Sequence, residues 1–324
     1  MQNLYFVGII GVQKVKISYC GCAMVIDKVK LKGLLKEKDI TKSALADTLN
    51  ISSRTIAKIG KNEDLSERVV GKIATFLGVE ITALAVSNPI LEALQEEMRL
   101  KTSGGIYHET QVKLTYNSNH MEGSTLTEEQ TRYIFETKTI GALSPCVSVD
   151  DVIETKNHFR CIDYIISRAL EPLSEQFILT LQKILKEGTE HADIYGAGVY
   201  KIKPNTVGGL ETTAPNEVAQ EVQKLINHYN GLKVVKFEDI VEFHYHFECI
   251  HPFQDGNGRI GRLIAFKQCL EKNVVPFYID DNNKWYYYRG LKEWEKEPNY
   301  LIETCRFGQD QYKMILEYFG VKNV

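Results

Sequence analysis

The sequence lacks a long apolar run. No stretch of the 324 residues approaches the roughly 18 consecutive apolar residues that a membrane-spanning helix requires, so no membrane association is expected. Residues 1–23 also lack a basic segment ahead of their apolar part and a small-residue cleavage site, which argues against a secretory signal. We therefore predict that residues 1–23 are a leader outside the fold, either a tag remnant or an upstream start.

The sequence also lacks a paired arrangement of cysteines. The seven cysteines are odd in number and scattered, and none belongs to a Cys-x-x-Cys pair. This pattern indicates neither a disulfide framework nor a zinc site, and it fits a reducing, cytoplasmic compartment best. The histidines His244, His246 and His251 are close in sequence, but they lie in an apolar helical stretch where packing is favoured over metal binding.

Charge of one sign is not in large excess. The chain has 39 Lys and Arg against 42 Asp and Glu, which gives a net charge of −3 and argues against a wholly basic nucleic-acid-binding protein. Residues 25–80 differ, because they hold eleven Lys and Arg against eight Asp and Glu. Any basic surface is therefore expected to be local.

Most of the recognisable chemistry lies in residues 251–262, which read His-Pro-Phe-Gln-Asp-Gly-Asn-Gly-Arg-Ile-Gly-Arg. Gly256, Asn257 and Gly258 can adopt positive φ angles and direct successive N–H groups into one concavity. The apolar residues that follow have helical spacing, so a helix is expected to begin there. A helix N-terminus behind such a turn binds anions. The stretch therefore predicts a phosphate site.

Reactive side chains flank this predicted phosphate site. Arg259 and Arg262 lie one turn apart on the expected helix, where both can reach the same phosphates. Asp255 is a hard oxygen ligand, of the kind that magnesium combines with di- or triphosphate. His251 has an ordinary pKa of about 6.5, so it can accept a proton from a hydroxyl near pH 7. Phe253 is expected to anchor the loop. Taken alone, these residues also fit a tight turn before an ordinary helix.

The pattern His-x-Phe-x-Asp-Gly-Asn-Gly-Arg-x-x-Arg resembles the signature of the Fic (filamentation induced by cAMP) family, and every fixed position is present. The resemblance covers about residues 105–320. It implies transfer of AMP from ATP to a Ser, Thr or Tyr hydroxyl of a target protein, with Mg²⁺ or Mn²⁺ held by Asp255. The implied catalytic residues are His251 as general base, Asp255, Asn257, Arg259 and Arg262. The implied nucleotide contacts are Phe253, Gly256, Asn257, Gly258, Arg259, Arg262, Tyr287 and Tyr288.

The last two contacts come from a Tyr-Tyr-x-x-Leu stretch, which Fic proteins commonly use to bracket the adenosine. Glu295 stands where many relatives carry asparagine, so this part departs from the family pattern. An aromatic helix of this kind also fits a plain core.

A second motif precedes the loop by more than a hundred residues. Ser118 and Glu122 are four positions apart, on one face of an expected helix, and Gly123 is a natural helix stop. The three residues resemble the (Ser/Thr)-x-x-x-Glu-(Gly/Asn) inhibitory motif of Fic proteins. The resemblance implies that Glu122 pairs with Arg262 and obstructs the γ-phosphate. The alternative is a helix that ends at glycine with an exposed glutamate.

Residues 24–80 predict a small helical bundle. Thr41, Ser52 and Ser66 are each a favourable N-cap, with an apolar residue before and another four positions after. Two of the expected helices flank a short turn at residues 50–51 and resemble a Cro/repressor-type helix-turn-helix domain. Candidate DNA contacts on its second helix are Ser53, Arg54 and Lys58. The alternative is a module that contacts only protein.

A strand-like alternation appears at residues 199–215, with a turn at Gly208 and Gly209. We predict an edge hairpin, since an exposed strand edge can hold a target segment by main-chain hydrogen bonds. In the Fic family this hairpin is the flap that positions the target, which implies a role for Val199, Tyr200, Lys201, Val207 and Gly208. A purely structural hairpin is the alternative.

The expected architecture is all-α. It consists of a helix-turn-helix bundle (24–80), a linker helix (81–105) and a helical Fic domain (106–320) with one β-hairpin flap and an inhibitory helix that ends near residue 122. The predicted function is protein adenylyltransferase. Alternatives are removal of AMP with Glu122 orienting a water, or a DNA-binding regulator with a latent Fic domain. Expected partners are ATP, a hydroxyl-bearing protein, and DNA, with a homo-oligomer also open.

Overall fold

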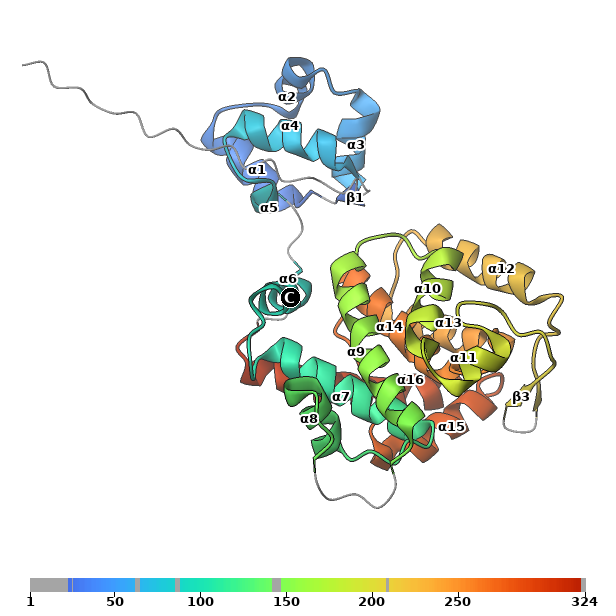
Figure 1. Ribbon diagram of the computed structural model, residues 1–324. Helices are drawn as coiled ribbons and strands as arrows, with labels where there is room; N and C mark the ends of the chain where they lie inside the picture. The colour runs from blue at the N-terminus through green and yellow to red at the C-terminus, as the bar shows by residue number, and fades with distance from the viewer. Residues whose placement is uncertain are drawn as a thin grey trace, which may run out of the picture. The chain divides into compact units, whose positions relative to one another are not determined.

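The computed structural model describes residues 23–24, 26–61, 65–84, 88–141, 147–207 and 210–321. The chain divides into two compact units between Ser87 and Asn88, and helices dominate both (Figure 1). The predicted leader, residues 1–23, lies outside the described residues except for Ala23. The all-α prediction with one hairpin is confirmed. Among the described residues, no helix is both long and apolar enough to span a membrane.

The first unit is a helical bundle closed by a short ladder. Its elements are β1 (Ala23–Met24), α1 (Lys28–Glu37), α2 (Lys42–Leu49), α3 (Ser53–Lys61), β2 (Leu65–Ser66), α4 (Glu67–Leu77) and α5 (Ile81–Leu84). One buried cluster, which includes Leu31, Leu45, Ile59 and Ile73, holds the helices together. The antiparallel pairing of β1 with β2 was not predicted, because two-residue strands leave no periodic pattern.

Two of the three predicted N-cap residues of this unit make side-chain cap hydrogen bonds. Thr41 Oγ1 accepts from Ala44 N at 3.1 Å and Ser52 Oγ from Thr55 N at 3.1 Å, as the N-cap pattern predicts. Ser66 stands at the N-cap of α4 but makes no side-chain cap hydrogen bond. Ser66 is therefore the N-cap residue, as predicted, but without the side-chain bond of the other two, and it also pairs with Ala23 in the ladder.

The second unit contains the remaining elements. They are α6 (Pro89–Leu100), α7 (Ile106–Met121), α8 (Glu128–Thr137), α9 (Val149–Arg168), α10 (Glu175–Lys186), α11 (Glu190–Tyr195), β3 (Thr206–Val207), β4 (Leu210–Glu211), α12 (Val218–Gly231), α13 (Phe237–Ile250), α14 (Asn257–Lys272), η1 (Asp281–Asn283), α15 (Lys284–Glu293) and α16 (Asn299–Tyr318). β3 and β4 form the predicted hairpin, with Thr206 opposite Glu211. Its turn, Gly208 and Gly209, lies outside the described residues.

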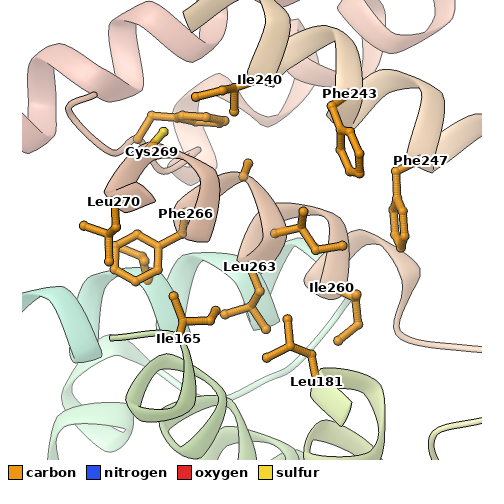
Figure 2. Close-up of a cluster of buried hydrophobic side chains, with 14 of the residues drawn as sticks. Ile165, Leu181, Ile240, Phe243, Phe247, Ile260, Leu263, Phe266, Cys269 and Leu270 are labelled. Atoms are coloured by element: carbon orange, nitrogen blue, oxygen red, sulfur yellow. The ribbon is translucent and has the colours of Figure 1, made fainter. Parts of the chain in front are cut away.

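Helix α14 is the centre of the second unit. Its side chains Ile260, Leu263 and Phe266 are buried, and Figure 2 shows them between Ile165 and Leu181 on one side and Ile240 and Phe247 of α13 on the other. A helix that is apolar on most sides is buried on most sides. The N-terminus of α14, where the predicted phosphate loop ends, is therefore held by the core.

The segment predicted as a linker helix, residues 81–105, is divided between the two units. Leu84 of α5 is buried in the first core, whereas Ile90, Leu91 and Leu94 of α6 are buried in the second. Asn88 caps α6 and also donates to Leu270 O at 2.6 Å. An amphipathic stripe has the same spacing whichever core it covers, so the sequence pattern could not assign α6 to the second unit.

Candidate active site

Of the three residues for which positive φ was predicted at the loop between α13 and α14, only Gly256 has it, because Asn257 and Gly258 already belong to helix α14. His251 ends α13 with φ 49°, and Gly256 precedes α14 with φ 86°. Between them, the Asn257 side chain accepts from Phe253 N at 2.7 Å and donates to Phe253 O at 2.8 Å. These bonds shape the backbone so that the first turn of α14 follows directly from the loop.

Two of the predicted nucleotide contacts serve the loop itself. The ring of Phe253 is fully buried and packs against Tyr200 and Phe247. Asn257 is 2% exposed, and both ends of its amide are bonded to Phe253. The side chains of Phe253 and Asn257 therefore stabilise the conformation of the loop from its buried side.

Arg262 joins the loop helix to α7. Its Nε donates to Ser118 Oγ at 3.0 Å, and its Nη2 donates to Ser118 O at 2.9 Å and to Glu122 Oε1 at 2.7 Å. Gly123 follows with φ 94°, as expected for a helix stop. Burial opposes ionisation of Glu122, but Arg262 outweighs it and lowers the pKa of the carboxyl. The glutamate is therefore an anion.

The carboxylate of Glu122 occupies the mouth of the glycine turn. A Cβ atom placed on Gly258 would lie 2.3 Å from Glu122 Oε1 and 2.9 Å from Arg262 Nη1. Gly258 is in the first turn of α14, where unbonded N–H groups and the helix dipole favour negative charge. A carboxylate thus lies against the first turn of α14, and only glycine at position 258 leaves room for it.

A cluster of four charges lies behind the loop, and we call it the Asp255 cluster. It contains Glu154 of α9, Lys186 of α10, and Asp255 and Arg259 of the loop and α14. Lys186 and Arg259 both donate to Glu154, and Lys186 also donates to Asp255 Oδ2 at 2.5 Å. Burial alone would raise the pKa of Asp255, but Arg259 and Lys186 lower it to about 2.

Asp255 suits a divalent ion only in combination with another ligand. Its side chain is 43% exposed and is the one carboxylate of the loop. Within the described ranges, no group of three or more His, Cys, Asp or Glu side chains could hold an ion by itself. Magnesium commonly binds one or two carboxylates together with substrate phosphates and waters. Asp255 with a bound triphosphate fits that ligand set.

The imidazole of His251 lies beside a buried carboxyl. Its side chain is 17% exposed, and Nδ1 is 3.9 Å from Glu248 Oε2. Burial lowers the pKa of His251, and it raises the pKa of Glu248 to about 8. His251 is therefore neutral near pH 7, as a general base requires. Because Nδ1 points to the protein interior, Nε2 is the nitrogen available to a substrate.

The two tyrosines of α15 have different surroundings. Tyr287 is 1% exposed, and its hydroxyl is 2.6 Å from His244 Nε2. Tyr288 is 39% exposed and donates to Met121 O at 3.1 Å, at the end of α7. Tyr288 is therefore exposed enough to contact a ligand, whereas Tyr287 is buried against His244. Glu295 accepts from Tyr245 at 3.0 Å and belongs to the packing of α13 against α15.

The predicted flap is hydrogen-bonded directly to the loop between α13 and α14. Lys201 N donates to Pro252 O at 2.9 Å, and Asn205 Nδ2 donates to Phe253 O at 2.9 Å. Tyr200 and Lys201 face inward, with Lys201 only 3% exposed, whereas Val199 and Val207 are 47% and 39% exposed. The exposed valines, and not the two inward residues, form the outer surface of this segment. Gly208 lies outside the described residues.

Several site residues were not found from the sequence. Lys186 and Glu154 hold the loop from two other helices, and Glu248 faces His251. A signal did exist for Lys186, because it follows Ile178 and Gln182 at helical spacing along the buried stripe of α10. A charged residue at a core-facing position of an amphipathic helix marks a buried ion pair.

The first unit contains the predicted helix-turn-helix geometry. Asn50 ends α2 with φ 50°, and α3 begins three residues later. Ser53 and Arg54 are exposed at the start of α3, while Lys58 is partly buried one turn further on. Ser53 and Arg54 are thus the candidate DNA contacts that a ligand can reach at the N-terminal end of α3.

The described chain consists of a helix-turn-helix unit followed by a helical unit in which the loop of residues 251–256 leads into the buried helix α14. A family model described as the Fic/DOC family matches residues 172–269, and one described as a Cro/C1-type HTH DNA-binding domain matches residues 30–89. A Fic/DOC family model and a Cro/C1-type helix-turn-helix model are thus both found in this chain, in its second and first unit respectively.

Similar proteins and structures agree with this assignment. A protein adenylyltransferase Fic from Nematostella vectensis is 29% identical over 185 residues, which are 55% of this chain and 42% of that protein. The counterpart from Drosophila melanogaster is 28% identical over 186 residues, 55% of this chain and 36% of that protein. The chain thus matches less than half the length of these curated relatives.

Solved structures share the fold. A Fic-domain-containing signalling protein from Bacteroides thetaiotaomicron superposes with a TM-score of 0.57 at 24% identity, covering 71% of this chain and 94% of that one. Fic-1 from C. elegans gives a TM-score of 0.54 at 17% identity, covering 90% of this chain and 85% of that one.

Proposed function

We propose that this protein transfers AMP from ATP to a Ser, Thr or Tyr hydroxyl of a target protein. The observation that carries the proposal is the anion on the first turn of α14, where Glu122 sits against Gly258 and pairs with Arg262. A site that holds a carboxylate in this way can hold a phosphate, because both are oxyanions recognised by N–H groups and arginine.

The reaction follows from the groups around that anion site. Nε2 of His251 accepts the proton of the target hydroxyl while its oxygen bonds to the α-phosphorus of ATP, and the bond to the bridging oxygen breaks to release pyrophosphate. Arg259 and Arg262 offset the phosphate charge. Mg²⁺ or Mn²⁺ bound by Asp255 and the phosphates would add further charge neutralisation. The chain itself contributes mainly positioning and electrostatics.

Glu122 is proposed to hold this site in an inhibited state. Its carboxylate accepts a hydrogen bond from Arg262 and lies against Gly258, and a γ-phosphate needs both of these contacts. ATP then binds without its full set of contacts, so the α-phosphorus is not presented to the hydroxyl. Release of Glu122 would restore the full set of contacts to ATP.

Mass spectrometry of the Glu122→Gly protein after incubation with ATP tests both parts of the proposal. We expect added AMP on the protein itself or on an added target, at about tenfold or more above the parent chain. His251→Ala in the same background should remove it, since no base remains. Equal labelling in the parent and Glu122→Gly proteins would contradict inhibition. Loss of AMP from a labelled target with Mg²⁺ or Mn²⁺ and no ATP would instead favour AMP removal.

A second role, DNA binding by the first unit, is supported by the helix-turn-helix match and by exposed Arg54 at the start of α3. We expect the protein to retard its own promoter DNA, less so as salt rises, because phosphate contacts release counterions. Arg54→Ala should weaken binding about tenfold, whereas Lys32→Ala, exposed on α1, should not. Equal effects of the two substitutions would argue against recognition by α3.

A further inference from the structure

A buried lysine lies against the proposed metal ligand. Lys186 is the last residue of α10, and its side chain is 2% exposed. Its ammonium donates to Asp255 Oδ2 at 2.5 Å and also to Glu154. Lysine is almost never fully buried without a partner, and no step of the reaction described above uses this one.

Asp255 is already neutralised without a metal ion. Its Oδ1 accepts from Gly256 N at 2.6 Å and lies 3.6 Å from Arg259 Nη2, and its Oδ2 is held by Lys186. The Asp255 cluster as a whole pairs two carboxylates with two cations. A divalent ion that approached Asp255 alone would meet a carboxylate whose charge is already balanced.

We propose that Lys186 is the resting counter-ion of Asp255 and keeps a divalent cation out of the site until the triphosphate of ATP brings one. This rests on the proposed function, because it takes Asp255 as the metal ligand. An ammonium and a divalent ion on one carboxylate repel each other, most strongly where water is scarce. The negative charge of a triphosphate offsets that repulsion.

Metal and nucleotide therefore bind cooperatively, and Lys186 is a positioning residue that sets the coupling. The ligand set agrees with this, since Asp255 provides one carboxylate and the phosphates must provide the rest. By linkage, the factor by which nucleotide tightens metal binding equals the factor by which metal tightens nucleotide binding.

The test uses the full chain with Glu122→Gly, so that nucleotide can bind with its full set of contacts, and titrates Mn²⁺ by electron paramagnetic resonance with and without a non-hydrolysable ATP analogue. Lys186→Met keeps the apolar stem and removes the charge. Without nucleotide it should bind Mn²⁺ about tenfold or more tightly than the parent, and the effect of the analogue should shrink by the same factor. Lys186→Arg, which keeps the charge, should behave as the parent. Lys183→Met, exposed on the same helix, is the matched control.

The outcomes separate this inference from the proposed function. A gain in Mn²⁺ affinity that disappears on adding Asp255→Ala supports it. Unchanged or weaker affinity in Lys186→Met, while binding of the metal–analogue complex still needs Asp255, overturns the role of Lys186 and leaves the proposed function. Metal–analogue binding that is indifferent to Asp255→Ala overturns both. If circular dichroism shows that Lys186→Met is unfolded, Lys186→Gln, which keeps an amide donor without charge, makes the same comparison.

Discussion

Glu248 shows the effect of burial on a single carboxyl group next to His251. It lies near the end of α13, and its Oε1 has no hydrogen-bond partner in the described part of the chain. The nearest imidazole nitrogens, on His244 and His251, are 4.0 and 3.9 Å away. Burial raises the pKa of its carboxyl to about 8 against the opposing effect of Arg262. Glu248 is therefore mostly protonated at pH 7.

The raised pKa of Glu248 predicts that the free energy of unfolding depends on pH. Between pH 4.5, the ordinary pKa of glutamate, and about 8, the folded protein keeps a proton that the unfolded chain has released. Stability therefore falls as pH rises through this window, by up to about 1.4 kcal/mol per pH unit. Glu248→Gln does not titrate, so its melting temperature should increase relative to the parent as pH goes from 5 to 8.

Thermal unfolding followed by circular dichroism at several pH values checks this. Glu242→Gln, on the exposed face of the same helix, should show no such trend. A constant difference between Glu248→Gln and the parent over the whole range would mean that Glu248 is ionised in the folded protein at pH 5.

At the scale of elements, the flap depends on one buried lysine. Lys201 Nζ donates to Asn205 Oδ1 at 2.8 Å, to Thr212 Oγ1 at 2.6 Å and to Ile250 O at 3.2 Å. It ties both sides of the hairpin to the residue before His251. Burial lowers the pKa of this amine to about 8, so desolvation is offset only in part by these bonds.

Lys201→Met should therefore loosen the flap. It keeps the apolar stem but removes the donor from Thr212 Oγ1 and Ile250 O, at a cost of about 1–3 kcal/mol for each that stays buried and unsatisfied, while Asn205 Oδ1 still accepts from Thr212 Oγ1. Hydrogen exchange measured by mass spectrometry should become about tenfold faster or more in residues 203–212, with little change in α14. Lys203→Met, exposed in the same segment, is the control. Unchanged exchange in Lys201→Met would show that the backbone bonds to the loop suffice.

At the scale of the whole molecule, the two units have separate hydrophobic cores. The buried cluster of the first unit and that of the second have no member in common. The boundary falls at Ser87 and Asn88, and Asn88 caps a helix of the second unit. A fragment that starts at residue 88 therefore keeps every buried side chain of the second core.

We expect the fragment 88–321 to unfold cooperatively within about 3 °C of the corresponding transition in the full chain, a shift that corresponds to roughly 1 kcal/mol for a domain of this size. Differential scanning calorimetry measures both. A fragment that begins at residue 106 should be far less stable, because it loses α6 with Ile90, Leu91 and Leu94. A large drop for the longer fragment would mean that the second unit needs the first.

Features carried by contiguous residues could be predicted from the sequence. The turn of residues 251–262, the caps at Thr41 and Ser52, and the hairpin are local, and their geometry follows from the residues that form them. The assignment of residues 81–105 was beyond local reasoning, because tertiary packing decides which of the two cores each helix covers.

The sequence by itself determined the order of the reactive groups along residues 251–262 and the start of a helix behind Gly256, because these features depend on neighbouring residues alone. Only the tertiary structure decided which charges meet. Lys186 reaches Asp255 across 69 positions and Glu122 reaches Arg262 across 140. Such pairs form because packing buries the cation of each pair beside a carboxylate that is distant in sequence, and no spacing along the chain records that.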